Sequence, residues 1–362
     1  MPHALFLVDQ LASGGAPRSV LKVTRALVAS GVRVTLVALS DRLGLPVPEG
    51  AEVHVVAFTP KGRWQKLHRY RLHAKHLDDF LKTQGNTYDL VVSNLHHAHQ
   101  VTRRSCLAEQ AWLCIRSDPW QELLSNKHGW RRIIKRIKVR RLYDDRRVIA
   151  LTRTNLESLA RIGSRPRQAE VIPNVLDVAR IHELMGQPHN DKALEGTDYC
   201  VYVGRLNMRQ KRLDRLLQAY RASELSLPLV LIGNGDHLAV EQEIAKWGLQ
   251  ERVWMLGARD NPYPYMHQAK ALLLASDYEG LPNVLLEALA CGTPVVSTDC
   301  LSGPRDILTG ELADGLVPLD DIQAFARAIR ASVEHPPHIP DNVVDAYKPA
   351  AIAARYRALM AP

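Results

Sequence analysis

Two glutamates, Glu279 and Glu287, lie on either side of the predicted start of a helix. Glu279 follows an apolar run, Gly280–Asn283 has the composition of a turn, and the apolar stretch from Asn283 ends at Gly292. The first N–H groups of such a helix can bind phosphate oxygens, and the carboxylates can accept hydrogen bonds from sugar hydroxyls. The eight residues from Glu279 to Glu287 would span about 12 Å if fully helical, comparable to the distance from a hexose across a diphosphate to a ribose. A solvated glutamate is the usual alternative, but burying Glu287 on an otherwise apolar helix is costly without a ligand or partner.

Two loops with glycines follow other predicted strands of the same half. In the first, Arg205 and Lys211 can converge as cations on a diphosphate, and Gly204 lets a ligand approach the backbone. In the second, Gly233 and Gly235 are expected to give a nucleotide base room against the backbone, because ligands of doubly wound sheets bind beyond the carboxyl ends of the strands. The alternatives are a solvated basic loop and a tight turn.

Four polar residues of the N-terminal half also follow predicted strands. His96 and His97 come after one strand, and Arg116 and Asp118 come after the next. We interpret them as candidates for contact with the acceptor or with the donor sugar. A surface histidine or a structural Arg–Asp pair is the alternative for each.

The elements that must position these residues alternate between strand and helix in both halves. Strands are predicted at Ala4–Val8, Val32–Leu39, Val53–Phe58, Leu90–Ser93, Trp112–Ile115, Val148–Thr152, Cys200–Val203, Leu227–Ile232, Val253–Leu256 and Ala271–Leu274. This alternation predicts an α/β protein of two doubly wound, Rossmann-like domains. We place an N-terminal acceptor-binding domain at residues 1–176, a polar linker at 177–197 and a nucleotide-binding domain at 198–346, with a C-terminal helix in 347–362 that packs back on the first domain.

The segment Val201–Leu308 resembles the nucleotide-binding domain of family-4 retaining glycosyltransferases of the GT-B fold, whose hallmark is such a pair of glutamates. Asn261-Pro262-Tyr263 and the segment Thr298–Leu308 are similar to bacterial members that build surface polysaccharides and lipid-linked oligosaccharides. Gly14-Gly15-Ala16 matches the first glycine loop of the family, and Pro17 departs from the glutamate that is frequent there.

The resemblance implies two domains that face each other across a cleft and transfer a hexose or N-acetylhexosamine with retention. The donor would be a nucleotide-diphosphate sugar, with a UDP-sugar favoured, and the acceptor a lipid-linked or lipopolysaccharide glycan. Glu279 would contact the hexose, Glu287 the ribose, and Arg205 and Lys211 the diphosphate. The full set of implied donor contacts adds Gly15, Gly204, Gly233, Gly235, Gly280, Asn283 and Val284.

No cofactor and no metal ion are expected. The five cysteines form no C-x-x-C pair, and the aspartates of Asp78-Asp79, Asp144-Asp145 and Asp320-Asp321 are adjacent rather than spaced as D-x-D. The negative charge that develops on a departing nucleoside diphosphate can be neutralised by two cations and a helix dipole.

Positive charge is concentrated in the N-terminal half. Residues 1–180 contain 30 Lys and Arg against 15 Asp and Glu, whereas residues 181–362 contain 17 against 23. This asymmetry indicates an anionic partner for the first half. The sequence lacks an apolar run of about 18 residues and a signal-peptide pattern, so we expect a cytoplasmic location.

The segment Trp130–Tyr143 is predicted to form a basic amphipathic helix. Its apolar face carries Trp130, Ile133, Ile134 and Ile137. The cations expected to meet an anionic membrane surface are Arg131, Arg132, Lys135 and Arg136. Each would contribute about 1 kcal/mol, enough together for peripheral attachment to the inner face of the cytoplasmic membrane. The alternative is a helix that packs on its own sheet.

Two other functions use the same features. A nucleotide-sugar epimerase would also need two Rossmann-like halves, but no basic helix directed at a lipid. A nucleic-acid-binding protein would use the basic half, yet the helix has isoleucines where interleaved aromatic residues are expected for base stacking. Nucleic acid is therefore not expected as a partner.

Overall fold

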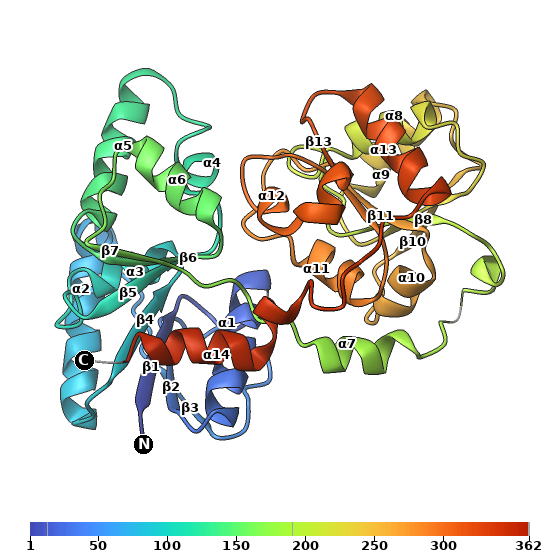
Figure 1. The fold of residues 1–362 in the computed structure, drawn as a ribbon. Helices are drawn as coiled ribbons and strands as arrows, with labels where there is room; N and C mark the ends of the chain where they lie inside the picture. Colours follow the sequence, from blue (N-terminus) through green and yellow to red (C-terminus); the bar gives the residue numbers. More distant parts are fainter. Residues whose placement is uncertain (13, 190, 361–362) are drawn as a thin grey trace. The chain divides into compact units, whose positions relative to one another are not determined.

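The computed structural model describes residues 1–12, 14–189 and 191–360, which fold into two α/β units (Figure 1). The N-terminal unit comprises Met1–Val175 and the chain from Tyr347 onward, and the C-terminal unit comprises Leu176–Ala346. Each unit contains one sheet of parallel strands. The predicted fold class of two doubly wound domains is confirmed.

The sheet of the N-terminal unit is built around a buried central strand, β1. Its alternate residues face opposite layers: Phe6 packs in the cluster that contains α1 and α14, and Leu5 and Leu7 pack in the cluster that contains α2 and α3. Apolar residues on both faces are typical of a parallel strand with helices on either side. The strand order is β3-β2-β1-β4-β5-β6-β7. The strands are β1 (His3–Val8), β2 (Arg33–Ala38), β3 (Ala51–Val55), β4 (Leu90–Asn94), β5 (Ala111–Ile115), β6 (Arg147–Ala150) and β7 (Gln168–Val171).

The C-terminal helix completes this unit. The helices are α1 (Gly15–Ala29), α2 (Gly62–Gln84), α3 (His96–Thr102), α4 (Pro119–Leu123), α5 (Gly129–Tyr143), α6 (Arg153–Ile162) and α14 (Pro349–Ala358). Ile352, Ala353 and Tyr356 of α14 are buried in the same cluster as Phe6 and Val20. Figure 1 shows α14 alongside α1, so the last helix of the chain packs on the unit that its first strand builds.

The C-terminal unit repeats the plan with a sheet in the order β10-β9-β8-β11-β12-β13. Its strands are β8 (Cys200–Val203), β9 (Leu229–Ile232), β10 (Val253–Gly257), β11 (Ala271–Leu274), β12 (Val295–Thr298) and β13 (Leu316–Val317). Its helices are α7 (Val178–Met185), α8 (Leu213–Ala222), α9 (His237–Lys246), α10 (Tyr263–Gln268), α11 (Asn283–Ala290), α12 (Pro304–Ile307) and α13 (Ile322–Glu334), with 3₁₀ turns η1 (Lys192–Leu194), η2 (Gly310–Gly315) and η3 (Asp345–Tyr347).

The segment predicted as a linker, residues 177–197, is folded onto the C-terminal unit. It contains α7, whose apolar residues Val178 and Ile181 are buried, and α7 packs against α10 and α11. His182 shares a hydrogen bond of 3.0 Å with the carbonyl of Ala290. The segment was predicted as a linker from its polar composition, because the apolar face of α7 is short. Asn190, which contributed to that prediction, lies outside the described residues.

Strand order determines where the loops of each unit meet. In the C-terminal sheet, successive strands are added in one direction from β8 to β10 and in the other direction from β11 to β13. In the N-terminal sheet, the same change of direction lies between β1 and β4. Loops that leave the carboxyl ends of two such neighbouring strands diverge to opposite faces and leave room for a ligand. The loops after β8 and β11 carry Arg205, Lys211 and Glu279, and those after β1 and β4 lead to Gly15 and His96, the first residues of α1 and α3.

We expect Ile352→Ala to destabilise the N-terminal unit by about 2–5 kcal/mol, because it removes a fully buried side chain from a packed cluster. The free energy of unfolding can be measured by urea denaturation followed by circular dichroism. Arg355→Ala is the matched control: its exposed guanidinium donates to the Val171 carbonyl, and its loss should cost less than about 1 kcal/mol. Equal losses for the two variants would contradict a stabilising role for the docking of α14.

Candidate active site

The loops after β8 and β11 bring Lys211 and Glu279 into a buried ion pair. The distance from Lys211 Nζ to Glu279 Oε1 is 2.6 Å, and the side chains are 13% and 9% exposed. Ser276 Oγ donates a second hydrogen bond of 2.6 Å to the same carboxylate oxygen. Two residues predicted from separate motifs, 68 positions apart, thus lie in contact.

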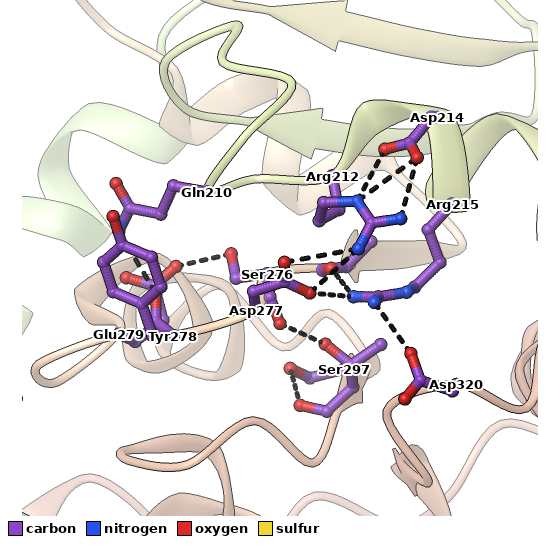
Figure 2. A network of polar contacts seen from close by, with 12 residues as sticks. Gln210, Arg212, Asp214, Arg215, Ser276, Asp277, Tyr278, Glu279, Ser297 and Asp320 are labelled. Carbon is purple, nitrogen blue, oxygen red and sulfur yellow. Dashed lines mark hydrogen bonds and ion pairs between the residues drawn. The ribbon is translucent and has the colours of Figure 1, made fainter. Parts of the chain in front are cut away.

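Backbone contacts tie these two loops together at Gln210. The Asp277 N–H donates to the Gln210 carbonyl over 2.8 Å, and Gln210 Nε2 donates to the Tyr278 carbonyl over 3.1 Å. Figure 2 shows Gln210 beside Tyr278 and Glu279 at one end of a longer polar network. Because Gln210 precedes Lys211 and Tyr278 precedes Glu279, these bonds fix the backbone on both sides of the ion pair.

Arg212 joins the same loops through its side chain. Its guanidinium donates to Asp214 at 2.8–3.2 Å and to both carboxylate oxygens of Asp277 at 3.2 Å (Figure 2). The residue has a φ of 48°, a conformation that costs a non-glycine residue about 1 kcal/mol or more. Burial acts to raise the pKa of Asp214, but the hydrogen bonds and charge of Arg212 outweigh it and lower that pKa.

Arg215 anchors the network inside the unit. Its side chain is only 4% exposed, and its Nη1 donates to the Ala275 carbonyl at 2.9 Å and pairs with Asp277 at 2.8 Å. Its Nη2 pairs at 3.2 Å with Asp320, whose side chain is 87% exposed. Asp277 therefore accepts from two arginines, while Asp320 reaches the network only at its surface. Sequence reasoning missed this network because an Asp beside a glutamate motif gives no signal of its distant partners.

The helix α11 starts at Asn283, as predicted, with Pro282 at its N-cap and without a side-chain cap from the described residues. Val284 occupies its first turn, where no acidic residue stands, and Gly280 lies in the preceding loop, so the first N–H groups suit an anion. Glu287 is half-buried on the next turn. Burial, and then the charge of Glu287, raise the pKa of Tyr263.

The structure gives Gly233 and Gly235 a role in the packing of two loops. A Cβ at Gly233 would overlap the carbonyl oxygen of Gly204, and a Cβ at Gly235 would overlap that of Leu206. The Gly204 and Leu206 N–H groups donate to Ile232 and Asn234 at 2.9 Å, so the two loops run in close backbone contact. Both glycines are therefore needed for the packing of the two loops. Their contact with a donor, and that of Gly204, stay predictions.

Arg205 lies on the surface of the loop that ends in Lys211. It is exposed, and its Nη2 contacts Gln210 Oε1 at 3.4 Å. The Tyr202 hydroxyl donates to the Arg205 carbonyl at 2.8 Å, which holds its backbone in place. The backbone of Arg205 is thus held in place, and its exposed guanidinium lies beside Gln210.

In the N-terminal unit, Gly14 forms the N-cap of α1 with a φ of 104°. Apart from its chain neighbours and the backbone of α1, no described atom lies within 4 Å of the Cβ position of Gly15, and the first turn of α1 has no acidic residue. The start of this helix is therefore open to an anion. The contact of Gly15 with donor phosphates stays a prediction.

His96 and Arg116 line one cavity of about 170 Å³ at the carboxyl ends of β4 and β5. His97 points elsewhere, sharing a hydrogen bond of 3.0 Å with His73. Burial, the Lys135 charge and the Arg69 charge lower the pKa of His96 to about 4. The structure thus separates two neighbouring histidines that the sequence could not distinguish.

The expected alternative of an Arg116–Asp118 pair is wrong. Arg116 donates to Asn94 Oδ1 at 2.8 and 3.1 Å and to Asn174 Oδ1 at 2.9 Å. Asp118 is buried and caps α4 by accepting from the Gln121 N–H at 2.8 Å. This cap accounts for Asp118 structurally, and Arg116 is the member of the pair that faces the cavity.

Sequence reasoning missed Asp9 and His99, which shape the same edge of the sheet. Asp9 accepts from the Ala98 N–H at 2.7 Å at the start of α3, and burial raises its pKa to about 6. His99 is held between the Tyr143 hydroxyl at 3.1 Å and the Ser93 carbonyl at 3.0 Å, and burial lowers its pKa to about 3. Asp9 lies directly after β1, a position that strand-end reasoning could have singled out.

The helix α5 covers the predicted basic amphipathic segment, and its apolar face is exposed. Trp130 is 66% and Ile133 62% exposed, and Ile134 and Ile137 are also exposed. The residues of α5 that are buried are Val139, Leu142 and Tyr143 in its C-terminal half. The alternative in which the isoleucine face packs on the sheet is therefore wrong.

Two of the four cations predicted for membrane contact have partners within the unit. Arg132 Nε donates to the Lys127 carbonyl at 2.6 Å, and Arg136 Nε donates to the Ile162 carbonyl at 2.7 Å. Arg131 lies over the Trp130 ring, with 5.5 Å between the guanidinium carbon and the ring centroid. Lys135 lines two cavities instead.

Within the described ranges, no three His, Cys, Asp or Glu side chains are grouped so that they could hold a metal ion. In the same part of the chain, none of the helices combines the length and apolar character needed to cross a membrane.

Two family models match the chain, one in each unit. "Glycosyl transferase 4-like domain" matches residues 14–175, and "Glycosyl transferases group 1" matches residues 197–335. The two matches contain the loops of both candidate sites. The chain therefore belongs to the glycosyltransferases of the GT-B fold. This family gives no support to the epimerase alternative.

Relatives and solved structures agree with this class. The N-acetylgalactosamine-N,N'-diacetylbacillosaminyl-diphospho-undecaprenol 4-alpha-N-acetylgalactosaminyltransferase of Campylobacter jejuni is 27% identical over 352 residues, covering 94% of this chain and 91% of that protein. The lipopolysaccharide 1,6-galactosyltransferase of Escherichia coli K12 is 31% identical over 157 residues, covering 40% of this chain and 42% of that protein.

The fold is shared with known structures over nearly the whole chain. The apo form of the lipopolysaccharide outer core galactosyltransferase WaaB has a TM-score of 0.73 at 20% identity and covers 99% of both chains. Anabaena Alr3699/HepE in complex with UDP and glucose has a TM-score of 0.72 at 18% identity and covers 99% of this chain and 97% of its own.

We expect Asp277→Asn to lower kcat for sugar transfer by about tenfold or more, with a smaller effect on the donor KM. The amide keeps the shape of the side chain but loses the charge that holds Arg212 and Arg215, so Lys211 and Glu279 shift from their positions. Steady-state kinetics with varied donor, at a temperature where thermal unfolding shows both proteins folded, measures the effect.

Asp320→Asn is the control for this prediction. It also removes a carboxylate from Arg215, but at the exposed end of the network and away from the loop of Glu279. Its kcat should stay within about twofold of the parent. If both variants lose activity equally, Asp277 acts on general stability and not on the position of the ion pair.

Proposed function

We propose that the chain transfers a hexose or N-acetylhexosamine from a UDP-sugar to a lipid-linked or lipopolysaccharide glycan, with retention and without a metal ion. The observation that carries the proposal is the buried Lys211–Glu279 pair, whose glutamate lies four residues before the start of α11 at Asn283. It combines a cation for phosphate, a carboxylate for sugar hydroxyls and N–H groups for an anion in one place. The acceptor class is supported by the names of the Campylobacter and Escherichia relatives, and the nucleotide by the UDP bound to HepE.

Donor binding would change the partners of this ion pair. Without donor, Lys211 and Glu279 satisfy each other, which avoids leaving a buried charge unpaired. A diphosphate would attract the Lys211 ammonium, and the freed Glu279 carboxylate would accept hydrogen bonds from the hydroxyls of the donor sugar. As negative charge grows on the leaving diphosphate, Lys211, Arg205 and the N–H groups of α11 stabilise it.

The exposed face of α5 is our proposed contact with the inner face of the cytoplasmic membrane. Trp130, Ile133, Ile134 and Ile137 project from a helix rich in Arg and Lys, a pattern typical of helices that lie in a membrane interface. The apolar side chains would supply most of the binding, because Arg132 and Arg136 are held by backbone carbonyls.

The anomeric configuration of the product and the response to EDTA test the reaction. Nuclear magnetic resonance of the purified product should show the sugar linked in the configuration that it had in the donor, and transfer should continue in excess EDTA. An inverted product would contradict retention, and loss of activity restored only by Mg²⁺ or Mn²⁺ would contradict a metal-free site. Conversion of the nucleotide sugar to its epimer without an acceptor would favour the epimerase.

The double variant Ile133→Ser/Ile137→Ser tests the membrane contact. We expect it to bind vesicles of phosphatidylcholine and phosphatidylglycerol about tenfold or more weakly in a sedimentation assay, because two apolar side chains no longer enter the interface. Leu238→Ser, which removes a similarly exposed side chain from α9, should bind like the parent. Equal binding by all three proteins would leave the exposed face of α5 without a role at the membrane.

A further inference from the structure

The helices α2, α3 and α5 enclose a basic cavity of about 400 Å³ in the N-terminal unit. Its cations are Arg69, Arg103, Arg104, Lys135, Lys138 and Arg141. The remaining lining residues include Tyr70, His96 and Gln100, but no aspartate or glutamate. Such a one-sided set of charges is suited to an anionic ligand.

These cations have no acidic partner in the part of the chain that the structure describes. None of the six forms a salt bridge there with a carboxylate. Burial and the charges of Arg104, Arg146 and Arg141 lower the pKa of Arg103, and burial and the charges of Lys138 and Lys127 lower that of Lys135. The cavity therefore stores electrostatic repulsion that a bound anion would relieve.

Two of the arginines are held in place before any ligand binds. The guanidinium carbons of Arg69 and Arg104 lie 4.6 and 5.6 Å from the centre of the Tyr70 ring. Arg69 also donates to the Tyr70 hydroxyl at 2.8 Å, and Arg104 donates to the carbonyl and side-chain oxygens of Gln100 at 2.7 and 2.8 Å. Fixed guanidinium groups lose less entropy when they bind a phosphate.

The basic cavity adjoins two others, because it shares lining residues with each of them. It shares His96 with the cavity at the carboxyl ends of β4 and β5, where Arg116 also lies. It shares Lys135 and Lys138 with a cavity of about 520 Å³ that is lined by Trp130 and Ile134. Three environments thus follow one another: a polar sheet edge, a basic cavity and an apolar helix face. The Nδ1 atom of His96, at the first junction, is buried without a hydrogen-bond partner among the described residues.

We propose that the basic cavity binds the phosphate or diphosphate group of a lipid-linked acceptor. The saccharide end of the acceptor then lies toward His96 and Arg116, and its lipid chain lies along Trp130 and Ile134. This inference rests on the acceptor class of the proposed function and adds where that acceptor is held. A cavity walled by three helices suits one phosphorylated group of a single molecule, whereas the headgroups of a leaflet would meet a flat surface.

The double variant Arg103→Gln/Arg141→Gln tests the cavity in the full chain. Neither side chain has a hydrogen bond or salt bridge to a described residue, so the fold should be retained, with a melting temperature at or above that of the parent. Calorimetric titration with farnesyl diphosphate should show binding weakened by about tenfold or more, since each charge-assisted hydrogen bond to phosphate contributes about that factor. The parent should bind farnesyl diphosphate more tightly than either inorganic pyrophosphate or farnesol.

Arg161→Gln/Arg165→Gln is the matched control, because it removes two exposed arginines of the same unit that do not line the cavity. Its affinity for farnesyl diphosphate should stay within about twofold of the parent. Affinity lost equally in both variants, or in neither, would overturn the proposal. So would a cavity variant that loses binding only to vesicles of phosphatidylcholine and phosphatidylglycerol, since the ligand would then be a phospholipid surface.

These measurements remain separate from the test of sugar transfer. If the cavity assignment fails, the cavity variant still binds UDP and transfers sugar to acceptor with an unchanged acceptor KM. If the proposed function fails, no transfer occurs in the parent, while the difference between the two variants in binding farnesyl diphosphate still reports on the cavity.

Discussion

The ion pair between Lys211 and Glu279 is the contact on which the candidate donor site depends. Two buried charges are tolerated only when they are paired and further hydrogen-bonded, and removing one partner leaves the other at a cost of several kcal/mol. Ser276 supplies the further hydrogen bond, and Asp277 ties both loops to Arg212 and to the buried Arg215. In the proposed function, a bound sugar diphosphate would take the place of Glu279 beside Lys211 and of Lys211 beside Glu279.

Strand order explains why residues so far apart in the chain form this pair. The parallel strands β8 and β11 are neighbours at the point where the order of the strands across the sheet changes direction. Their loops therefore leave the same edge of the sheet side by side. The N-terminal unit uses the same geometry at β1 and β4, where Asp9 caps α3 and His96 faces a cavity. In each unit the sheet supplies rigidity and the loops supply the chemistry.

The positive charge of the N-terminal half has a defined place in the structure. A net excess of cations indicates an anionic partner but does not say whether it is a surface, a polymer or a small group. The cavity between α2, α3 and α5 gathers six of these cations around one space, and the exposed Ile134 of α5 lines a neighbouring cavity that shares Lys135 and Lys138 with it. Charge and apolar surface together favour a phosphorylated lipid over nucleic acid, whose bases would need aromatic platforms.

The sequence by itself determined the features that depend on neighbouring residues. Strand ends, the start of α11 at Asn283 and the amphipathic pattern of α5 could be read because their signals lie within a few turns of chain. It missed β7, whose residues Gln168–Val171 are mostly exposed and polar, and the folding of α7 onto the C-terminal unit. Only the tertiary structure showed that Gly233 packs on Gly204, that Arg116 pairs with asparagines and that three helices form a basic cavity. Those contacts join segments that are far apart in the sequence and that the strand order brings together. The residues around a side chain in the sequence do not indicate which distant residue it will contact.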